Sequence, residues 1–279
     1  MNVQRLAAFT QGQIGGNPAG VVFVDEMPAD SQMLAVAAEV GFSETAFLQA
    51  LDEGFRIRYF SPETEVPFCG HASIASAAAI GQRWGEGDYK FLLNAGEISI
   101  TTELDPSGLW RSSLQSPPAQ VHDTDPDWLQ AMLAEFAMSQ HDLNPTLPCK
   151  IASAGARHLI VPLSSRERLR AMQYDMAIVK ALMLEQGLIT VCLFFRETHA
   201  HIHSRNAFAV GGVFEDPATG AAAAALGGYL REYAEPANDI LIEQGTDMGI
   251  PCQLDVTIPD DMNAGIKVAG TSRAMSDDE

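Results

Sequence analysis

Residues 69–84 read Cys-Gly-His-Ala-Ser-Ile-Ala-Ser-Ala-Ala-Ala-Ile-Gly-Gln-Arg-Trp, and residues 219–233 read Thr-Gly-Ala-Ala-Ala-Ala-Ala-Leu-Gly-Gly-Tyr-Leu-Arg-Glu-Tyr. Each stretch predicts an Ala-rich helix that begins just after a glycine, at Gly70 and at Gly220. Such a pair within one chain suggests an internal repeat, in which the segments around the two helices also match.

Three more pairs of segments match in the same order. Gly41-Phe42 and the strand after it match Gly187-Leu188 and its strand, residues 55–60 match 200–205, and residues 94–96 match 243–245. The order of strand, strand, loop, helix and strand is kept in both halves. The sequence therefore predicts two similar halves, and such halves usually place a ligand in the cleft between them.

Short β-branched or alternating runs predict many strands, and only a few helices accompany them. The strands are expected at 19–24, 55–60, 90–93, 98–102, 158–161, 190–195, 240–243 and 253–258. Further helices are expected at about 31–40 and after Asp125-Pro126. Without an alternating strand–helix order, this mixture predicts the α+β class.

A Pro-rich stretch at residues 112–126 is the best linker candidate. We therefore expect one domain over residues 1–115 and a second over 116–264. The terminal strand 265–275 is expected to pack back onto the first domain.

The composition limits the possible partners. Of 279 residues, 47% are hydrophobic, and 17 Lys and Arg stand against 36 Asp and Glu, for a net charge of −19. This core-forming content excludes intrinsic disorder. The negative charge disfavours nucleic acids and anionic membrane surfaces. The absence of an apolar run of about 20 residues, of a signal-peptide pattern and of CxxC pairs predicts a cytoplasmic protein.

Glu44 lies between two phenylalanines in Phe42-Ser43-Glu44-Thr45-Ala46-Phe47. Desolvation raises the pKa of a carboxyl group, and a raised pKa suits proton transfer near neutral pH. Thr190 stands at the matching position of the second half, as expected if the acid is needed only once. The alternative is a surface glutamate at a helix exit.

The segment Pro67-Phe68-Cys69-Gly70-His71-Ala72 offers an anion site, because backbone N–H groups at a helix start are unpaired. His71 falls in the first turn, where the helix dipole favours the neutral imidazole. The alternative is a capping loop with a hydrogen-bonded histidine. Cys69 is a candidate thiolate nucleophile or base. Its counterpart is Thr219, which does not support a racemase with paired thiols.

The second helix start follows Glu215-Asp216-Pro217. If both helix starts face one cleft, they hold a small acidic molecule from two sides. Asp216 is then a candidate to orient His71 or to act as a second carboxylate. The alternative is an ordinary Asp-Pro helix start.

Alternating histidines at His199, His201 and His203 suggest a metal site, since they share one face of a strand. The repeat, however, aligns His201 and His203 with Arg56 and Arg58, on a polar and solvated face. We therefore expect no metal there.

Together these segments resemble the phenazine-biosynthesis isomerase family (PhzF-like), which shares its fold with diaminopimelate epimerase. The motifs that carry the resemblance span nearly the whole chain: Gly-Asn-Pro-Ala-Gly-Val-Val at 16–22, the segments 42–47, 67–72 and 215–220, Glu-Gln-Gly at 243–245, and Met-Gly-Ile-Pro at 248–251.

The resemblance implies two pseudo-symmetric domains, each a curled mixed sheet around a central helix. It also implies an active site between the domains, no cofactor, no metal and a homodimer. The matching glutamate, Glu44, moves a proton, and His71 and Asp216 assist. The implied substrate-binding positions are Asn17, Cys69, Gly70, Ala72, Thr219, Gly220 and Ala221. The family commonly has serine at the position of Ala221, so one side-chain hydrogen bond is missing here.

The first functional hypothesis is thus a cofactor-independent isomerase of a small carboxylate-bearing metabolite, of the trans-2,3-dihydro-3-hydroxyanthranilate isomerase type. An amino-acid epimerase or racemase that uses Cys69 is the second. A non-catalytic metabolite-binding protein is the third.

Overall fold

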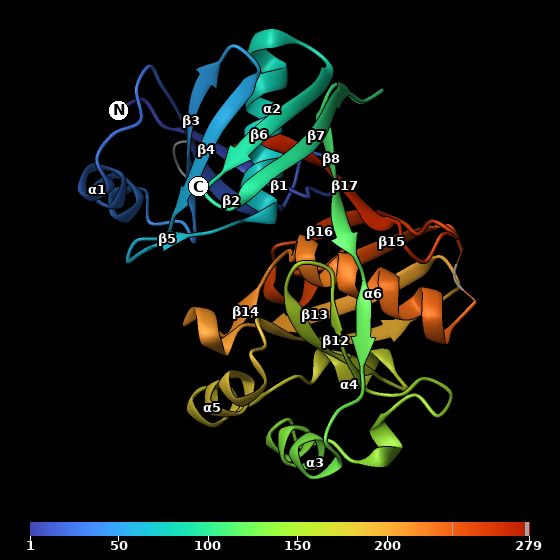
Figure 1. Ribbon diagram of the computed structural model, residues 1–279. Coiled ribbons are helices and arrows are strands. Elements are labelled where there is room, and N and C mark those ends of the chain that lie inside the picture. The colour runs from blue at the N-terminus through green and yellow to red at the C-terminus, as the bar shows by residue number, and fades with distance from the viewer. Residues whose placement is uncertain (236, 277–278) are drawn as a thin grey trace. The chain divides into compact units, whose positions relative to one another are not determined.

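The computed structural model describes residues 1–235, 237–276 and 279 (Figure 1). The chain divides into two compact units, one of residues 1–115 with 269–279 and one of residues 116–268. None of the helices in the described residues has the length and apolar character to cross a bilayer.

Strand β8 (Trp110–Pro118) carries the chain from the first unit into the second. The linker expected at 112–126 is therefore wrong for its first part, which is regular strand. Pro117 and Pro118 occupy the last two positions of β8, where a missing backbone N–H is tolerated. Strand β17 (Gly265–Ala274) carries the chain back, and its end pairs with β1 at Leu6↔Ala274.

In the part of the chain that the structure describes, the first unit contains seven further strands and two helices. These are β1 (Gln4–Ala8), β2 (Asn17–Val24), α1 (Asp30–Val40), β3 (Thr45–Leu51), β4 (Gly54–Phe60), β5 (Glu65–Val66), α2 (Gly70–Trp84), β6 (Gly87–Leu93) and β7 (Gly96–Leu104).

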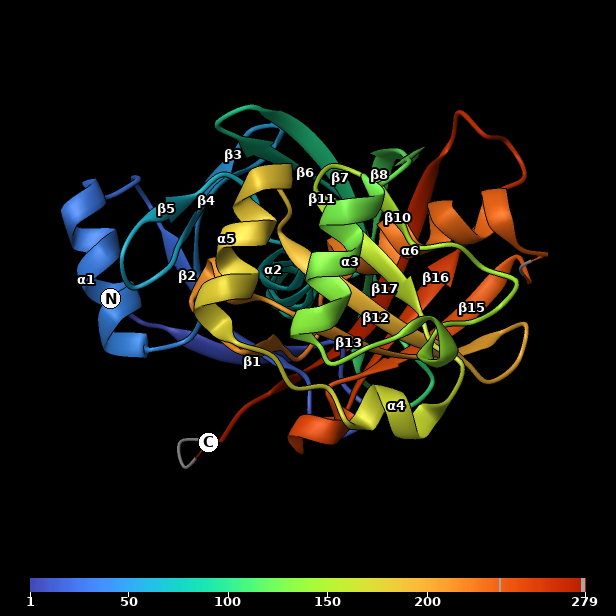
Figure 2. The same ribbon diagram turned by 90° about the horizontal axis from the view of Figure 1, so that it is seen from below.

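Helix α2 is the centre of the first unit. It contacts β1, β2, β3 and β7, and every residue from His71 to Gly81 is buried. Figure 2 views α2 nearly along its axis. Its Ala, Ser and Gly side chains are small enough to let strands approach it from several sides, as a helix buried all round requires. At Gly81 even a Cβ atom would lie 2.4 Å from the Trp110 ring.

Within the described residues, the second unit contains eight further strands, four helices and three short 3₁₀ turns. These are β9 (Gln120–His122), α3 (Pro126–Glu135), η1 (Gln140–Asp142), β10 (Lys150–Ser153), β11 (Arg157–Pro162), α4 (Arg166–Arg170), α5 (Met176–Gln186), β12 (Thr190–Arg196), β13 (His201–Ala207), η2 (Ala209–Gly211), β14 (Glu215–Asp216), α6 (Gly220–Tyr233), β15 (Asp239–Gln244), η3 (Thr246–Met248) and β16 (Cys252–Thr257).

Helix α6 takes the place in the second unit that α2 takes in the first. It is buried from Ala222 to Leu230 and contacts β9, β10, β11, β12 and β16. Helices α3, α4 and α5 pack into a hydrophobic cluster that includes Trp128, Leu169 and Met183.

The strand pairings repeat from one unit to the other. In the first unit, β1–β2, β3–β4, β4–β5 and β6–β7 are antiparallel, while β2–β3 and β4–β6 are parallel. In the second, β10–β11, β12–β13, β13–β14 and β15–β16 are antiparallel, while β11–β12 and β13–β15 are parallel. The two units thus share one topology.

The pairings correct the expected alignment of β4 with β13. Phe60 pairs with Glu65 in the first unit, and Ala207 pairs with Glu215 in the second. Arg58 therefore corresponds to Arg205, and the expected match of His203 with Arg58 is wrong by two residues. A shift of two leaves every side chain on the same face of a strand, so the alternating pattern alone does not detect it.

The histidines also differ from the expectation of a solvated face. The side chains of His201 and His203 are only 29% and 15% exposed.

Gly245 gives a test of the second unit's packing. Its φ is +75°, and a Cβ atom there would lie 2.2 Å from the backbone oxygen of Ile250. Gly249 has nearly the same φ, +79°, with nothing within 4 Å. We expect Gly249→Ala to cost about 1 kcal/mol of backbone strain. We expect Gly245→Ala to cost about 1–3 kcal/mol more, because the backbone must move. Urea unfolding of both variants measures the difference, and equal losses would contradict the clash.

Candidate active site

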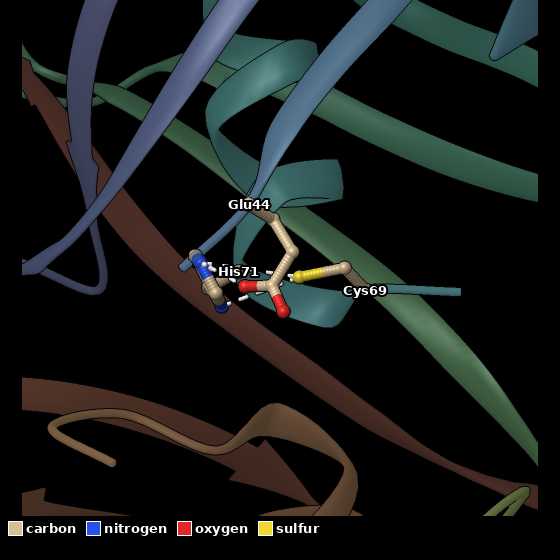
Figure 3. Close-up of side chains that lie close together, drawn as sticks. All are labelled: Glu44, Cys69 and His71. Atoms are coloured by element: carbon tan, nitrogen blue, oxygen red, sulfur yellow. Dashed lines mark hydrogen bonds and ion pairs between the residues drawn. The ribbon is translucent and has the colours of Figure 1, made fainter. Parts of the chain in front are cut away.

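Glu44, Cys69 and His71 lie close together in the first unit (Figure 3). Glu44 Oε2 is 3.4 Å from His71 Nε2, and Cys69 Sγ is 3.4 Å from His71 Nδ1. The Ser43 hydroxyl also lies 3.4 Å from His71 Nε2. The imidazole is thus placed between a carboxylate and a thiol.

The chain around Glu44 is fixed on both sides. Helix α1 ends at Gly41, which has φ +74° and donates its N–H to the oxygen of Ala37. The backbone oxygen of Glu44 accepts from Gly20 N–H at 3.2 Å, just before β3 begins to pair with β2. The Glu44 side chain is 15% exposed, and it is therefore largely desolvated while still reachable by solvent.

The start of α2 places the other two side chains. Cys69 is the N-cap residue but makes no side-chain cap, and His71 is the second residue of the helix. Among the described residues, no acceptor meets the N–H groups of Gly70, His71 and Ala72. These N–H groups at the positive end of the helix dipole form the kind of site that binds a carboxylate or phosphate.

A buried pair of hydroxyls supports this helix start. Ser73 Oγ donates to the backbone oxygen of Cys69 at 2.7 Å, and the Tyr59 hydroxyl lies 2.6 Å from Ser73 Oγ. Burial raises the pKa of Tyr59 well above its ordinary value, which keeps it a hydrogen-bond donor. The roles of Tyr59 and Ser73 were not predictable from the sequence, because nothing in the local pattern of β4 shows that Tyr59 contacts α2.

In the second unit, the start of α6 is held by a glutamine. Gln244 Nε2 donates to the Asp216 backbone oxygen at 2.7 Å and to Thr219 Oγ1 at 3.2 Å, and its Oε1 accepts from Thr219 N–H at 3.3 Å. Thr219 Oγ1 in turn donates to the Asp216 carboxylate. Gln244 is 1% exposed, so it positions Asp216 and Thr219 from inside the unit. The Glu-Gln-Gly motif at 243–245 marked this segment in the sequence, but it did not predict this role.

The other expected site residues are distributed over both units. Asn17 is the first residue of β2 and is 3% exposed, and Ala72 is fully buried in α2. Gly220 and Ala221 are the first two residues of α6 and are partly exposed.

Thr190, at the position that corresponds to Glu44, forms hydrogen bonds with two other buried polar residues. Thr190 Oγ1 donates to Asn206 Oδ1 at 2.9 Å and accepts from His158 Nδ1 at 2.7 Å. All three residues are buried, and His158 Nε2 has no hydrogen-bond partner in the described part of the chain. The second unit therefore keeps the topology but has a neutral network where the first unit has its acid.

His158 makes stability depend on pH. Burial lowers the pKa of His158 from 6.5 to about 3. Below about pH 6.5 the unfolded chain binds a proton at His158 that the folded chain excludes. The free energy of unfolding therefore falls as the pH drops from 6.5 towards 3. From pH 7 to pH 5 we expect the free energy of unfolding to fall by about 2 kcal/mol in the wild type. This part of the pH dependence should be absent in His158→Asn. Urea unfolding at both pH values checks this, and an unchanged pH difference in the variant would contradict it.

The atoms of Glu44, Cys69 and His71 are also suitable in type for a metal. One ligand atom from each lies within 4.8 Å of the others. Thiolate, imidazole and carboxylate all bind zinc, so any metal titration of this protein must account for this triad.

Comparisons with known proteins cover nearly the whole chain. Residues 6–277 match the family model described as phenazine biosynthesis-like protein. An uncharacterized isomerase of Deinococcus radiodurans is 30% identical over 91% of this chain and 85% of its own length. The trans-2,3-dihydro-3-hydroxyanthranilate isomerase of Pseudomonas aeruginosa is 29% identical over 88% and 86%.

A solved structure confirms the predicted α+β fold class. The PhzF-family phenazine biosynthesis protein of Bacillus anthracis superimposes with a TM-score of 0.87, over 98% of this chain and 96% of that one. At 24% identity this likeness shows the fold alone.

Proposed function

Since the chain belongs to the phenazine biosynthesis-like (PhzC-PhzF) family of isomerases, we propose that it moves a proton between two carbons of a small carboxylate-bearing metabolite without a cofactor. Glu44 is the acid–base group. Asp216 as an assisting acid–base group and a homodimer as the working form are parts of the same proposal.

The contact between Glu44 and His71 carries this proposal. A largely desolvated carboxylate lies 3.4 Å from an imidazole that is itself buried at a helix start. Glu44 takes a proton from an activated carbon, and the electrons of the broken C–H bond move into the substrate's conjugated system. A new C–H bond forms when Glu44 returns the proton to another carbon. No oxidant or reductant is needed, and His71 hydrogen-bonds the developing charge.

The start of α2 gives the substrate an orientation. The N–H groups of Gly70, His71 and Ala72 would accept a substrate carboxylate, in spite of the chain's net charge of −19. With the carboxylate held there, the adjoining carbons lie beside Glu44. Ala221 cannot donate the side-chain hydrogen bond expected from the serine that is common in the family, and this favours a substrate that does not need that hydrogen bond.

The first test uses trans-2,3-dihydro-3-hydroxyanthranilate as the probe, incubated with the protein in D₂O and followed by NMR. An isomerised product is expected, and it carries solvent deuterium because the proton held by the partly exposed Glu44 exchanges with D₂O before it is returned. Because Ala221 favours a substrate that does not need that hydrogen bond, other cyclic dienes with a carboxylate complete the panel. Tight binding of these compounds with neither turnover nor exchange would overturn the proposal in favour of a binding protein.

Cys69 favours one alternative, an amino-acid epimerase. Its Sγ is 3.4 Å from His71 Nδ1, a contact through which imidazole can take up the thiol proton. Cys69→Ser distinguishes the two activities. It should largely preserve isomerase activity, which depends on Glu44, and abolish epimerase activity, which depends on the thiol. Inversion of an α-amino acid on chiral chromatography, lost in this variant, would favour the epimerase.

A further inference from the structure

A second group of ionisable side chains lies in the second unit, away from Glu44 and its partners. His201 and His203 share one face of β13, while Ile202 between them is fully buried on the other. Glu197 follows β12 in the turn to β13, where its N–H donates to the oxygen of His201. Glu243, in β15, pairs with His203 across the parallel ladder. Three neighbouring segments of one sheet thus supply two imidazoles and two carboxylates.

The carboxylates lie on opposite sides of the two rings. Glu197 Oε2 is 3.0 Å from His201 Nδ1 and 2.9 Å from His203 Nε2. Glu243 faces the remaining nitrogens, with Oε1 3.2 Å from His201 Nε2 and Oε2 3.3 Å from His203 Nδ1. The ring centroids are 4.8 Å apart.

Hydrogen bonding does not account for this arrangement. Of the four contacts, only that between His203 Nε2 and Glu197 Oε2 has hydrogen-bond geometry. His201 Nε2 is buried and has no hydrogen-bond partner within the described residues.

From this geometry we propose that Glu197, His201 and His203 bind a zinc ion through Glu197 Oε2, His201 Nδ1 and His203 Nε2. These three atoms all lie within 4.8 Å of one another. Ligand atoms of a tetrahedral zinc site are about 3.3 Å apart, given bonds of about 2.0–2.1 Å, so small side-chain movements bring the three into place. Water completes the fourth position.

Glu243 supports the two ligating rings. A zinc-bound histidine usually gives its other ring N–H to a carboxylate, which fixes the tautomer and the ring orientation. Glu243 faces that second nitrogen on both rings. Two neutral imidazoles and one carboxylate favour zinc over calcium or magnesium, which prefer oxygen ligands.

The bound ion would join the turn at Glu197 to β13. Because the ligands come from the folded sheet, zinc binds the folded chain in preference to the unfolded one and raises its thermal stability. This site is independent of the proposed proton transfer, and its test reads binding rather than activity.

The test is calorimetric titration of the metal-free full chain with Zn²⁺ at pH 7, in the wild type and in Cys69→Ser. Cys69→Ser removes the thiolate from the other candidate triad. In both proteins we expect one equivalent of zinc that His203→Ala weakens at least about 100-fold. Glu243→Gln should weaken it about 10- to 100-fold through the loss of ring orientation. His199→Ala is the matched control, because His199 is exposed and contacts the Glu235 backbone oxygen instead.

Two further readouts decide the outcome. Co²⁺ bound at this site should give tetrahedral visible bands without a thiolate charge-transfer band, whereas cobalt at Cys69 would show that band. Circular dichroism shows whether His203→Ala folds. If His203→Ala does not fold, Glu197→Gln takes its place in the titration. The proposal is overturned if no stoichiometric zinc binds in Cys69→Ser, or if the affinity is equal in His203→Ala and His199→Ala.

Discussion

Replacing Glu44 with glutamine should lower the rate of solvent-deuterium incorporation into a turned-over substrate by about 10²- to 10⁴-fold, the usual contribution of a general acid–base group. Glutamine keeps the size of the side chain and its contact with His71, but it cannot take up a proton. Substrate affinity should change little, because the start of α2 is untouched. Rates from NMR and affinities from calorimetry separate the two effects.

Glu39→Gln is the matched control for this experiment. Glu39 is exposed on α1, five residues before Glu44, and its loss alters the net charge equally. It should leave the exchange rate unchanged. If Glu44→Gln incorporated solvent deuterium at the wild-type rate, Glu44 would not be the acid–base group.

Replacing Glu215 with glutamine should destabilise the protein by about 3–5 kcal/mol, because one charge of a buried ion pair is left without its partner. Arg205 and Glu215 are only 9% and 2% exposed. Burial outweighs the attraction of Arg205 and raises the pKa of Glu215 above its ordinary value. Arg205 also donates to the Arg170 backbone oxygen at 2.9 Å, so its guanidinium cannot simply turn to solvent.

The repeat supplies the control for this prediction. Arg58 and Glu65 form the corresponding pair in the first unit, with an N–O distance of 2.6 Å, but their side chains are 15% and 25% exposed. Water can replace the lost partner there, so Glu65→Gln should cost about 1 kcal/mol or less. Chemical denaturation of both variants gives the comparison. Similar losses at the two sites would show that burial does not set the strength of this pair.

The helix positions were largely predictable from local sequence. The helices expected at about 71–84 and 31–40 are observed at Gly70–Trp84 and Asp30–Val40, and a glycine follows the last residue of each, Gly85 and Gly41. The cap expected near Asp30 is not formed, because Ala29 is the N-cap residue and Asp30 is the first residue of the helix. Helix α5 (Met176–Gln186) was not predicted, although Asp175 caps its start and Gly187 ends it. Its apolar residues do not form a narrow stripe, and Ile178 and Leu184 are exposed, so periodicity gave little signal.

The contacts between distant elements were not predictable. Local sequence gave Glu44 and His71 as separate candidates, and only the family resemblance implied that they act together. The folded unit places their side chains 3.4 Å apart. Tyr59 and Gln244 look like ordinary strand residues, yet each holds the start of a central helix through hydrogen bonds to another element. Such roles depend on packing across the sheet, which a local pattern does not encode.

The return of the chain through β17 has a consequence for biosynthesis. The unit that contains Glu44 is built from residues 1–115 and 269–279, and β1 pairs with the last part of β17. Translation makes these two pieces at different times, with the whole second unit made in between. Since domains generally fold as units during synthesis, the intervening unit can mature on the ribosome first. The N-terminal sheet must wait for its final strand, exposed meanwhile to chaperones and proteases.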